Sequence, residues 1–352
     1  MNDDGLRRAR AAGQLLHRPG RTPDVADLVG RLLALQAQDT TAARLALRAR
    51  ASGLTAAGVD TAITDRSVIR AWGPRGTLHL VATADLSWLL PLVGPPRVTG
   101  SMRRLAQLGV PGDTETLTGI VVRVLAGQGP LTKAELGRLL NDAGVPATGQ
   151  AIVHLAALGA VDGRVLLGPD RAGRPTYVHA ADWLGHEIAP EPDRDRAVAE
   201  LARRYLRSRG PAEPADLATW SGLPLRDARA GWAAVGAELV EVAHRDRMLY
   251  RLRGTVPAAP ATTVRLLPAF DEYLLSWRDR DLVVSPQHAR TVHPGGGIVH
   301  PTVIADGHVV GTWRLPGGKP VVTLFDDPAA HPDLGALDAE RADVPRFLAR
   351  TS

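Results

Sequence analysis

The chain has 352 residues, of which 45% are hydrophobic and 22% charged, with a formal net charge of +5; this composition is globular, sufficient for two to four modules, and excludes a disordered protein. It contains no cysteine, which excludes disulfides, thiolate nucleophiles and cysteine-based zinc sites. No signal peptide and no apolar run of about 18 residues is visible, so we expect a cytoplasmic protein without a membrane span.

Residues 24–35, "DVADLVGRLLAL", predict the first core helix, because their apolar residues recur at helical spacing. The pattern stops at two neutral amides, Gln36 and Gln38, which only Ala37 separates. Such a pair is unexpected in a chain that has 42 basic residues, 40 of them arginines.

A second helix is predicted directly after the amides. Asp39 or Thr40 is placed to cap this helix, which runs through "AARLALRARA". The stretch 67–83, "SVIRAWGPRGTLHLVAT", then predicts the end of an apolar helix, a Gly/Pro turn and a β-branched strand.

The middle of the chain predicts three helices followed by a β-hairpin, which is the element order of a winged helix. Thr132 and Glu135 form a capping box at the start of the second of these helices. The predicted elements occupy residues 116–130, 131–144, 148–161 and 162–178, with the hairpin turn at 168–173.

The same order recurs in the next part of the chain, and the first 90 residues fit it more loosely. Sequence identity between the three stretches is low, so the repeat is one of pattern. The third set of elements is predicted at residues 195–211, 213–223, 224–236 and 239–254, with a polar hairpin turn at 244–247.

From Thr255 onward the sequence predicts short strands with Gly and Asp-Gly turns and, after Asp326, a short closing helix. The expected fold class is therefore α+β, with tandem winged-helix modules and a small β-barrel-like module. The expected domains are residues 1–110, 111–190, 191–254 and 255–352.

Several stretches together resemble the AlkZ family of winged-helix DNA glycosylases. They are "LLALQAQD", "RAWGPRGTLHLVATADLSWLLPL", "GPAEPADLATWSGL", "LLPAFDEYLLSWRDR" and "HPTVIADGHVVGTW", together with the central winged-helix order. The most specific element is a Gln-apolar-Gln motif, which Gln36-Ala37-Gln38 matches. The sequence departs from the family at Gly296, in "HPGGGIVHP", where an Asn-Gly turn is expected.

The resemblance implies that Gln36 and Gln38 are catalytic. It also implies excision of bulky or cross-linked N7-alkylguanine by a monofunctional glycosylase that leaves abasic sites, and self-resistance to a DNA-alkylating natural product. Alkylation at N7 makes guanine a cationic leaving group, so no general acid is required. An amide can then hold a water near C1′ and turn its dipole toward an oxocarbenium-like transition state. Two amides at i and i+2 point to one side only on extended backbone.

Other chemistries have weaker support in the sequence. Asp39 is a rival general base, although its position favours a helix cap. A lyase needs an amine, and the only lysines, Lys133 and Lys319, lie in a helix of the second module and in a turn.

One acidic pair and four histidines are interpreted as structural groups. The "FDEY" carboxylates, Asp271 and Glu272, are interpreted as a strand-edge turn with Arg278 and Arg280 as ion partners. The histidines at 288, 293, 300 and 308 lack helical ligand spacing, so we expect no metal and no cofactor.

Double-stranded DNA with alkylated purines is the expected partner, bound by a monomer that is nucleoid-associated through this contact. Winged helices meet DNA through the third helix and the wing. The predicted DNA-binding residues are Arg75, Arg171, Arg174, Arg245, Arg247 and Arg278. The alternative is a non-catalytic winged-helix transcription regulator, for which the amide pair would have no use; condensin-type subunits also have tandem winged helices but need partner-binding segments that this sequence lacks.

Overall fold

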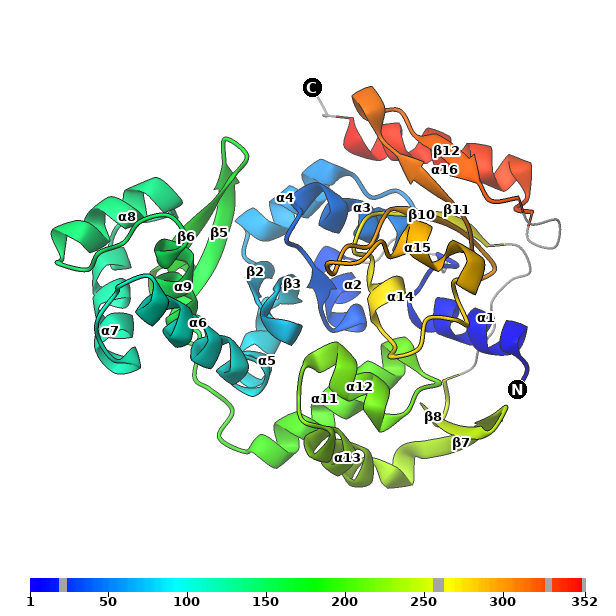
Figure 1. Cartoon of the computed structure of the whole chain (residues 1–352), viewed down its shortest axis with the longest axis horizontal. Helices are drawn as coiled ribbons and strands as arrows, with labels where there is room; N and C mark the ends of the chain where they lie inside the picture. Colours follow the sequence, from blue (N-terminus) through cyan, green and yellow to red (C-terminus); the bar gives the residue numbers. More distant parts are fainter. Residues whose placement is uncertain (19–23, 256–262, 327–330, 350–352) are drawn as a thin grey trace. The chain divides into compact units, whose positions relative to one another are not determined.

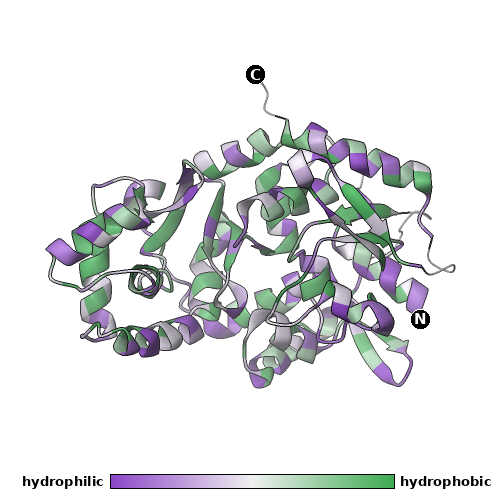
Figure 2. Cartoon of the chain, turned by 45° about the horizontal axis from the view of Figure 1, so that its top comes forward, coloured by the Kyte–Doolittle hydropathy of each residue, from purple (hydrophilic) through white to green (hydrophobic). Residues whose placement is uncertain are grey.

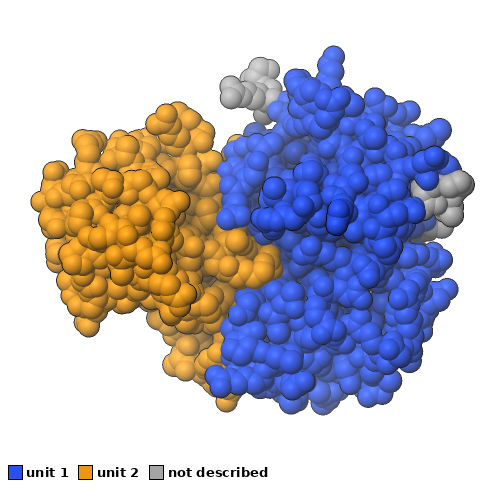
Figure 3. All heavy atoms as spheres, in the orientation of Figure 1, with its two compact units in different colours: residues 1–59, 198–352 blue, residues 60–197 orange. Residues whose placement is uncertain are grey.

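The computed structural model describes residues 1–18, 24–255, 263–326 and 331–349. The chain has a mixed α and β fold, which divides into two compact units (Figure 1, Figure 3). Unit 1 comprises residues 1–59 and 198–352, and unit 2 comprises residues 60–197. Residues 256–262, at the start of the predicted β-rich module, lie outside the described part. No helix within the described ranges is both long and apolar enough to cross a membrane.

Unit 2 contains an antiparallel sheet with strands in the order β3-β2-β5-β6-β4. The strands are β2 (Val68–Trp72), β3 (Leu78–Ala82), β4 (Leu131–Thr132), β5 (Val165–Arg171) and β6 (Arg174–His179). The helices are α5 (Leu86–Val93), α6 (Pro95–Gln107), α7 (Thr114–Leu125), α8 (Lys133–Asp142), α9 (Ala151–Leu158) and α10 (Ala180–Leu184).

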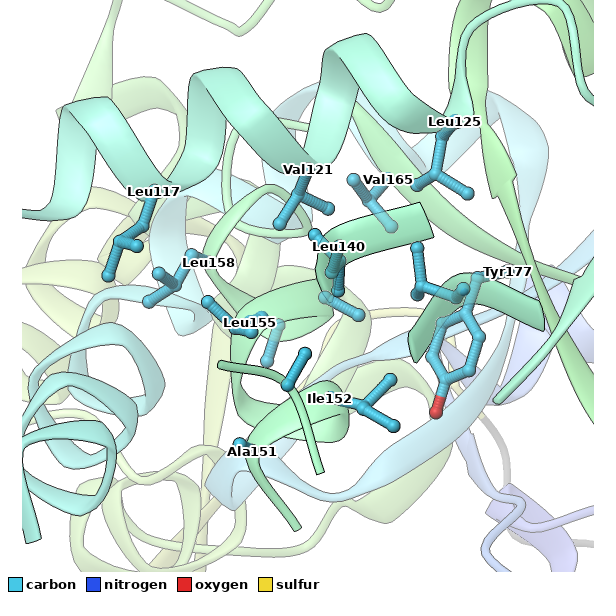
Figure 4. Close-up of a cluster of buried hydrophobic side chains, with 14 of the residues drawn as sticks. Leu117, Val121, Leu125, Leu140, Ala151, Ile152, Leu155, Leu158, Val165 and Tyr177 are labelled. Carbon is cyan, nitrogen blue, oxygen red and sulfur yellow. The ribbon is translucent and has the colours of Figure 1, made fainter. Parts of the chain in front are cut away.

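The core of unit 2 lies between α7, α8, α9 and the β5–β6 hairpin (Figure 4). Leu117, Val121 and Leu125 recur every four residues on one face of α7, and all three side chains are buried. Leu155 and Val165 belong to the same cluster. The predicted sequence of three helices and a hairpin is thus present, and the predicted Thr132–Glu135 capping box is confirmed at the start of α8.

The stretch "SVIRAW" was predicted to end an apolar helix, and this prediction is wrong. Residues 68–72 form strand β2, in which all five side chains are buried, and Ile69 pairs with Val81 of β3. A short apolar run that is buried on both faces has no period-2 pattern, so periodicity alone cannot distinguish it from a buried helix.

Unit 1 combines helices from both ends of the chain with two sheets. Its helices are α1 (Asp3–Gly13), α2 (Val25–Leu32), α3 (Thr40–Arg50), α12 (Pro214–Ser221), α13 (Leu225–Ala234), α14 (Glu272–Leu275), α15 (Ala289–Val292) and α16 (Leu334–Leu348). Its strands are β1 (Leu35–Gln36), β7 (Leu239–His244), β8 (Arg247–Leu252), β9 (Val264–Leu267), β10 (Thr302–Ala305), β11 (His308–Arg314) and β12 (Val321–Leu324). Helices α4 (Ala56–Thr64) and α11 (Arg194–Arg209) cross the unit boundaries.

The β-rich part of unit 1 is an open sheet, so the predicted barrel-like closure is wrong. Its strands lie in the order β12-β11-β10-β9, and β12 and β9 are its edges. Helices α3 and α16 pack beside β9, which covers that edge. Outer helices alternate hydrophilic and hydrophobic residues along their length, as expected of helices with one face on a core (Figure 2).

The two units divide the chain differently from the four predicted modules. Residues 1–59 group with residues 198–352, whereas the rest of the predicted first module, residues 60–110, groups with the second. The predicted third set of elements is present as α11, α12, α13 and the β7–β8 hairpin. That these sets are winged helices remains a prediction.

A buried ion cluster fixes α16 to α3 within unit 1. The guanidinium of Arg48 is fully buried; it lies 3.0 Å from Oε2 of Glu340 and 3.1 Å from Oδ2 of Asp343. It also donates a 2.8 Å hydrogen bond to the carbonyl of Leu266 on β9. The same Glu340 oxygen accepts the backbone N–H of Leu266, so one carboxylate connects two helices and a strand.

Replacing Glu340 with Ala should therefore lower the free energy of unfolding by about 3 kcal/mol, because a buried charge loses one of its two partners. Urea unfolding measures the change. Asp338→Ala, on the exposed side of the same helix, is the control and should shift stability by less than about 0.5 kcal/mol. Equal midpoints for the two variants would show that the cluster does not stabilise the fold.

Candidate active site

The amide motif lies just past the end of α2, where the chain passes from the short strand β1 into a bend at Gln38. Helix α2 ends at Leu32, and Leu33 has a positive φ of 74°, which breaks the helical path. Gln36 is in the short strand β1, and Ala37 is fully buried. The sequence prediction that the amides follow a helix end is confirmed.

The two amide side chains point toward each other. Nε2 of Gln36 donates to Oε1 of Gln38 over 3.4 Å, close to the upper limit for such a bond. Gln36 is 9% exposed, whereas Gln38 is exposed. The pair therefore combines one buried amide with one amide that is open to solvent.

Glu272 holds the backbone of the motif. Its Oε1 accepts the N–H of Gln36 at 3.0 Å. Its other oxygen accepts Nε1–H of Trp220 at 2.8 Å and a guanidinium N–H of Arg209 at 3.0 Å. The carboxylate is fully buried, so these charge-assisted bonds act in a low-dielectric setting in which they are strong.

Arg209, the last residue of α11, connects that carboxylate to the end of α2. Its guanidinium donates to the carbonyl of Leu32 at 2.8 Å and to that of Ala34 at 3.4 Å. Helix ends leave carbonyls without partners, and a cation there is favoured by the helix dipole. Burial lowers the pKa of Arg209, and the adjacent Glu272 carboxylate opposes this effect. The guanidinium carbon of Arg209 lies over the ring of Trp220, 4.2 Å from the ring centroid.

A second buried ion pair supports the first. Arg50 contacts Asp271 through two 2.8 Å bonds and also donates to Oε1 of Gln14 at 2.9 Å. Gln14 in turn donates to Oγ of Ser276, which also accepts from Nε of Arg209. The two pairs thus form one hydrogen-bonded network behind the motif.

The interpretation of "FDEY" as a strand-edge turn is wrong. Asp271 caps helix α14 by accepting the N–H of Tyr273, and Glu272 is the first residue of that helix. The expected partners are also wrong: Arg278 pairs with Glu213, and Arg280 contacts His293. The sequence shows the acidic pair, but it does not indicate which of the forty arginines contact it; in the structure these are Arg50 and Arg209.

Asp39 caps α3, as predicted, because its Oδ1 accepts the N–H of Ala42 at 2.9 Å. Its side chain is exposed and next to Gln38 in the chain. The cap occupies one carboxylate oxygen.

The predicted DNA-binding arginines of unit 1 all contact carboxylates. Arg245 pairs with Asp3 at 2.5 Å, and both Arg247 and Arg278 pair with Glu213, at 2.9 and 3.3 Å. Arg245 and Arg278 remain more than half exposed.

The predicted arginines of unit 2 lie at exposed turns. Arg171 and Arg174 flank the β5–β6 turn, and Arg75 lies in the turn between β2 and β3 with a φ of 57°. The Arg171 guanidinium, together with Thr132, lowers the pKa of Glu135 to about 2. A DNA-binding role for these six arginines stays a prediction.

The lysines are exposed, and the four histidines contact other protein groups. Lys133 begins α8, and Lys319 follows the turn at 316–318. His288 stacks on Phe325, and Nδ1 of His300 lies 3.0 Å from the carbonyl of Thr291. His308 contacts Ser285, and His293 contacts Arg280. Among the described residues, no group of three or more His, Asp or Glu side chains is arranged to hold a metal ion.

Comparison with known proteins supports the resemblance seen in the sequence. Residues 29–347 match the model of the family described as DNA glycosylase AlkZ-like. An interstrand DNA cross-link repair glycosylase from Streptomyces sahachiroi is 30% identical over 349 residues, covering 93% of this chain and 92% of that protein. The solved structure of Streptomyces sahachiroi DNA glycosylase AlkZ matches with a TM-score of 0.85 and 27% identity, over 99% of this chain and 98% of that one.

Glu272→Gln should destabilise the protein by about 3–5 kcal/mol, because it leaves the buried Arg209 without a counter-charge. It should also increase hydrogen exchange at the backbone N–H of Gln36, which loses a charged acceptor. Urea unfolding and native-state hydrogen exchange measure the two effects. Glu241→Gln, at an exposed position of β7, is the matched control. Unchanged exchange at Gln36 would refute the anchoring role of Glu272.

Proposed function

This chain belongs to the AlkZ-like family of DNA glycosylases, and we propose that it hydrolyses the N-glycosidic bond of N7-alkylated guanine in double-stranded DNA. Its enzyme class is therefore that of hydrolases acting on N-glycosyl bonds, and the alternative of a non-catalytic regulator is set aside. The proposed products are a free alkylated base and an intact abasic site. The proposed enzyme acts as a monomer on DNA in the cytoplasm.

One observation carries the proposal: two side-chain amides just past a helix end are hydrogen-bonded to each other, one of them buried on a main chain that Glu272 anchors and the other exposed. An amide has no useful pKa, so it cannot act as a true base. Its carbonyl can accept a hydrogen bond from water, and its dipole can face positive charge developing at C1′. This chemistry suits a substrate whose cationic base already leaves readily.

Because Nε2 of Gln36 donates to Gln38, the exposed amide is oriented before a substrate binds. We assign Gln38 to contact the attacking water and Gln36 to orient Gln38 and face the sugar. Preorganised dipoles avoid reorientation in the transition state, which is a major source of catalysis.

Bulky and cross-linked adducts are the proposed preferred substrates, with self-resistance to a DNA-alkylating natural product as the proposed role. The support is the name of the Streptomyces sahachiroi relative, an interstrand DNA cross-link repair glycosylase.

The proposal is tested with duplex DNA that carries N7-methylguanine or an N7-linked interstrand cross-link. We expect alkali-labile strand breaks at the lesion, no covalent protein–DNA band after borohydride, and full activity in EDTA. Borohydride traps a Schiff base, so a covalent band would indicate an amine nucleophile. Intact lesions after long incubation would refute glycosylase action on these substrates.

Replacing Gln38 with Ala should lower the single-turnover rate of base release on the order of 10²-fold or more, because one preorganised polar group is removed. DNA affinity should change by no more than a few-fold. Gln36→Ala should have a similar effect. Gln128→Ala, an exposed glutamine just after α7, is the control. A near wild-type rate for Gln38→Ala contradicts the mechanism.

A further inference from the structure

Unit 1 contains a pocket of about 290 Å³ that none of the residues of the amide network lines. Its walls come from the end of α1, from α2, from the end of α11, and from the end of β8 with the segment after it. Ala9, Ala12, Gly13, Gly210 and Gly254 line it, so small side chains leave the volume open.

The charged lining of this pocket is entirely basic. Arg31, Arg207 and Arg251 line it together with His17, and no Asp or Glu does. Across the described residues, none of the three arginines forms an ion pair with a carboxylate. By contrast, the fully buried Arg48, Arg50 and Arg209 all have carboxylate partners.

The surroundings of Arg31 disfavour the positive charge of its guanidinium group. Its Nη1 donates to the carbonyl of Arg207 at 2.6 Å, which fixes the guanidinium at the pocket wall. Burial, followed by the nearby charges of Arg207, Arg204 and Arg209, lowers the pKa of Arg31 to about 10. An anion in the pocket would relieve this repulsion, and the group would still be charged at neutral pH.

Arg251 is held in a similar way, since its Nη1 donates to the carbonyl of Thr255 at 3.0 Å. Both Arg31 and Arg251 thus have one guanidinium nitrogen fixed by backbone, and each retains further N–H donors. Arg207 is exposed and extends the basic lining to solvent.

We propose that this pocket binds a phosphate group through Arg31, Arg207 and Arg251. Guanidinium groups match phosphate oxygens in geometry and charge, and they bind them bidentately.

The phosphate group can come from the DNA backbone or from a free nucleotide. The chain favours the DNA backbone, because Arg31 lies five residues before Gln36 and their Cα atoms are at most about 18 Å apart. A backbone phosphate in the pocket would then lie within a few nucleotides of the excised base; this part of the inference rests on the proposed function.

The first test uses the full chain and inorganic phosphate, with chloride at equal ionic strength as the reference. Phosphate should raise the melting temperature, and the apparent affinity should fall about tenfold in Arg207→Gln and in Arg251→Gln. Arg207 is exposed, so its variant should fold even if the Arg251 variant does not. Arg341→Gln, which removes one half-exposed arginine of α16, is the control. No stabilisation beyond that of chloride, or equal losses in the control, would overturn the proposal.

The second test identifies the source of the phosphate. If the DNA backbone occupies the pocket, Arg207→Gln should reduce the slope of log affinity against log salt by about 0.9 for duplex DNA. If only a free nucleotide does, that slope should stay constant while adenosine monophosphate binding weakens. Gln38→Ala should keep the phosphate response, so failure of the pocket and failure of the glycosylase mechanism are distinguishable.

Discussion

The contact between Arg209 and Glu272 is the constraint on which the candidate site depends. Removing both charges from water is costly, and an ion pair alone seldom compensates for the cost. Here the carboxylate also accepts hydrogen bonds from the indole N–H of Trp220 and the backbone N–H of Gln36, and the guanidinium also donates to one carbonyl at the end of α2 and to one just after it. The pair therefore ties four segments to one point. The positive φ of Leu33, which redirects the chain out of α2, is held from both sides by these bonds.

Such rigidity suits a site that has no ionisable catalytic group. The surroundings of a histidine or a carboxylate can shift its pKa to suit the reaction, whereas an amide contributes only its dipole and its position. The proposed activity thus depends on how closely the motif is held. Anchoring the main chain of Gln36, and leaving the side chain of Gln38 exposed, separates the structural requirement from the chemical one.

The arginines of unit 1 serve several physical purposes. Arg48, Arg50 and Arg209 are buried and neutralised by acids, and they connect distant segments. Arg245, Arg247 and Arg278 are at the surface, also paired with acids. Arg31, Arg207 and Arg251 converge on a pocket without a carboxylate. A sequence pI near 10.1 therefore does not indicate by itself which surface attracts an anion, because ion pairing decides how much of each charge acts outward.

The sequence by itself determined the features that depend on neighbouring residues. The helical period of residues 25–32, the Thr132 capping box, the two hairpins and the position of the amides after a helix end all follow from local rules, and the motif pointed to the family. Tertiary structure alone decided whether residues 68–72 were helix or strand, that the β-rich sheet stays open, and which arginines neutralise Asp271 and Glu272. The physical reason is separation along the chain: Glu272 contacts Arg209 across 63 residues and the backbone N–H of Gln36 across 236. Any of forty arginines could satisfy a buried carboxylate, and only the packed fold selects which one reaches it.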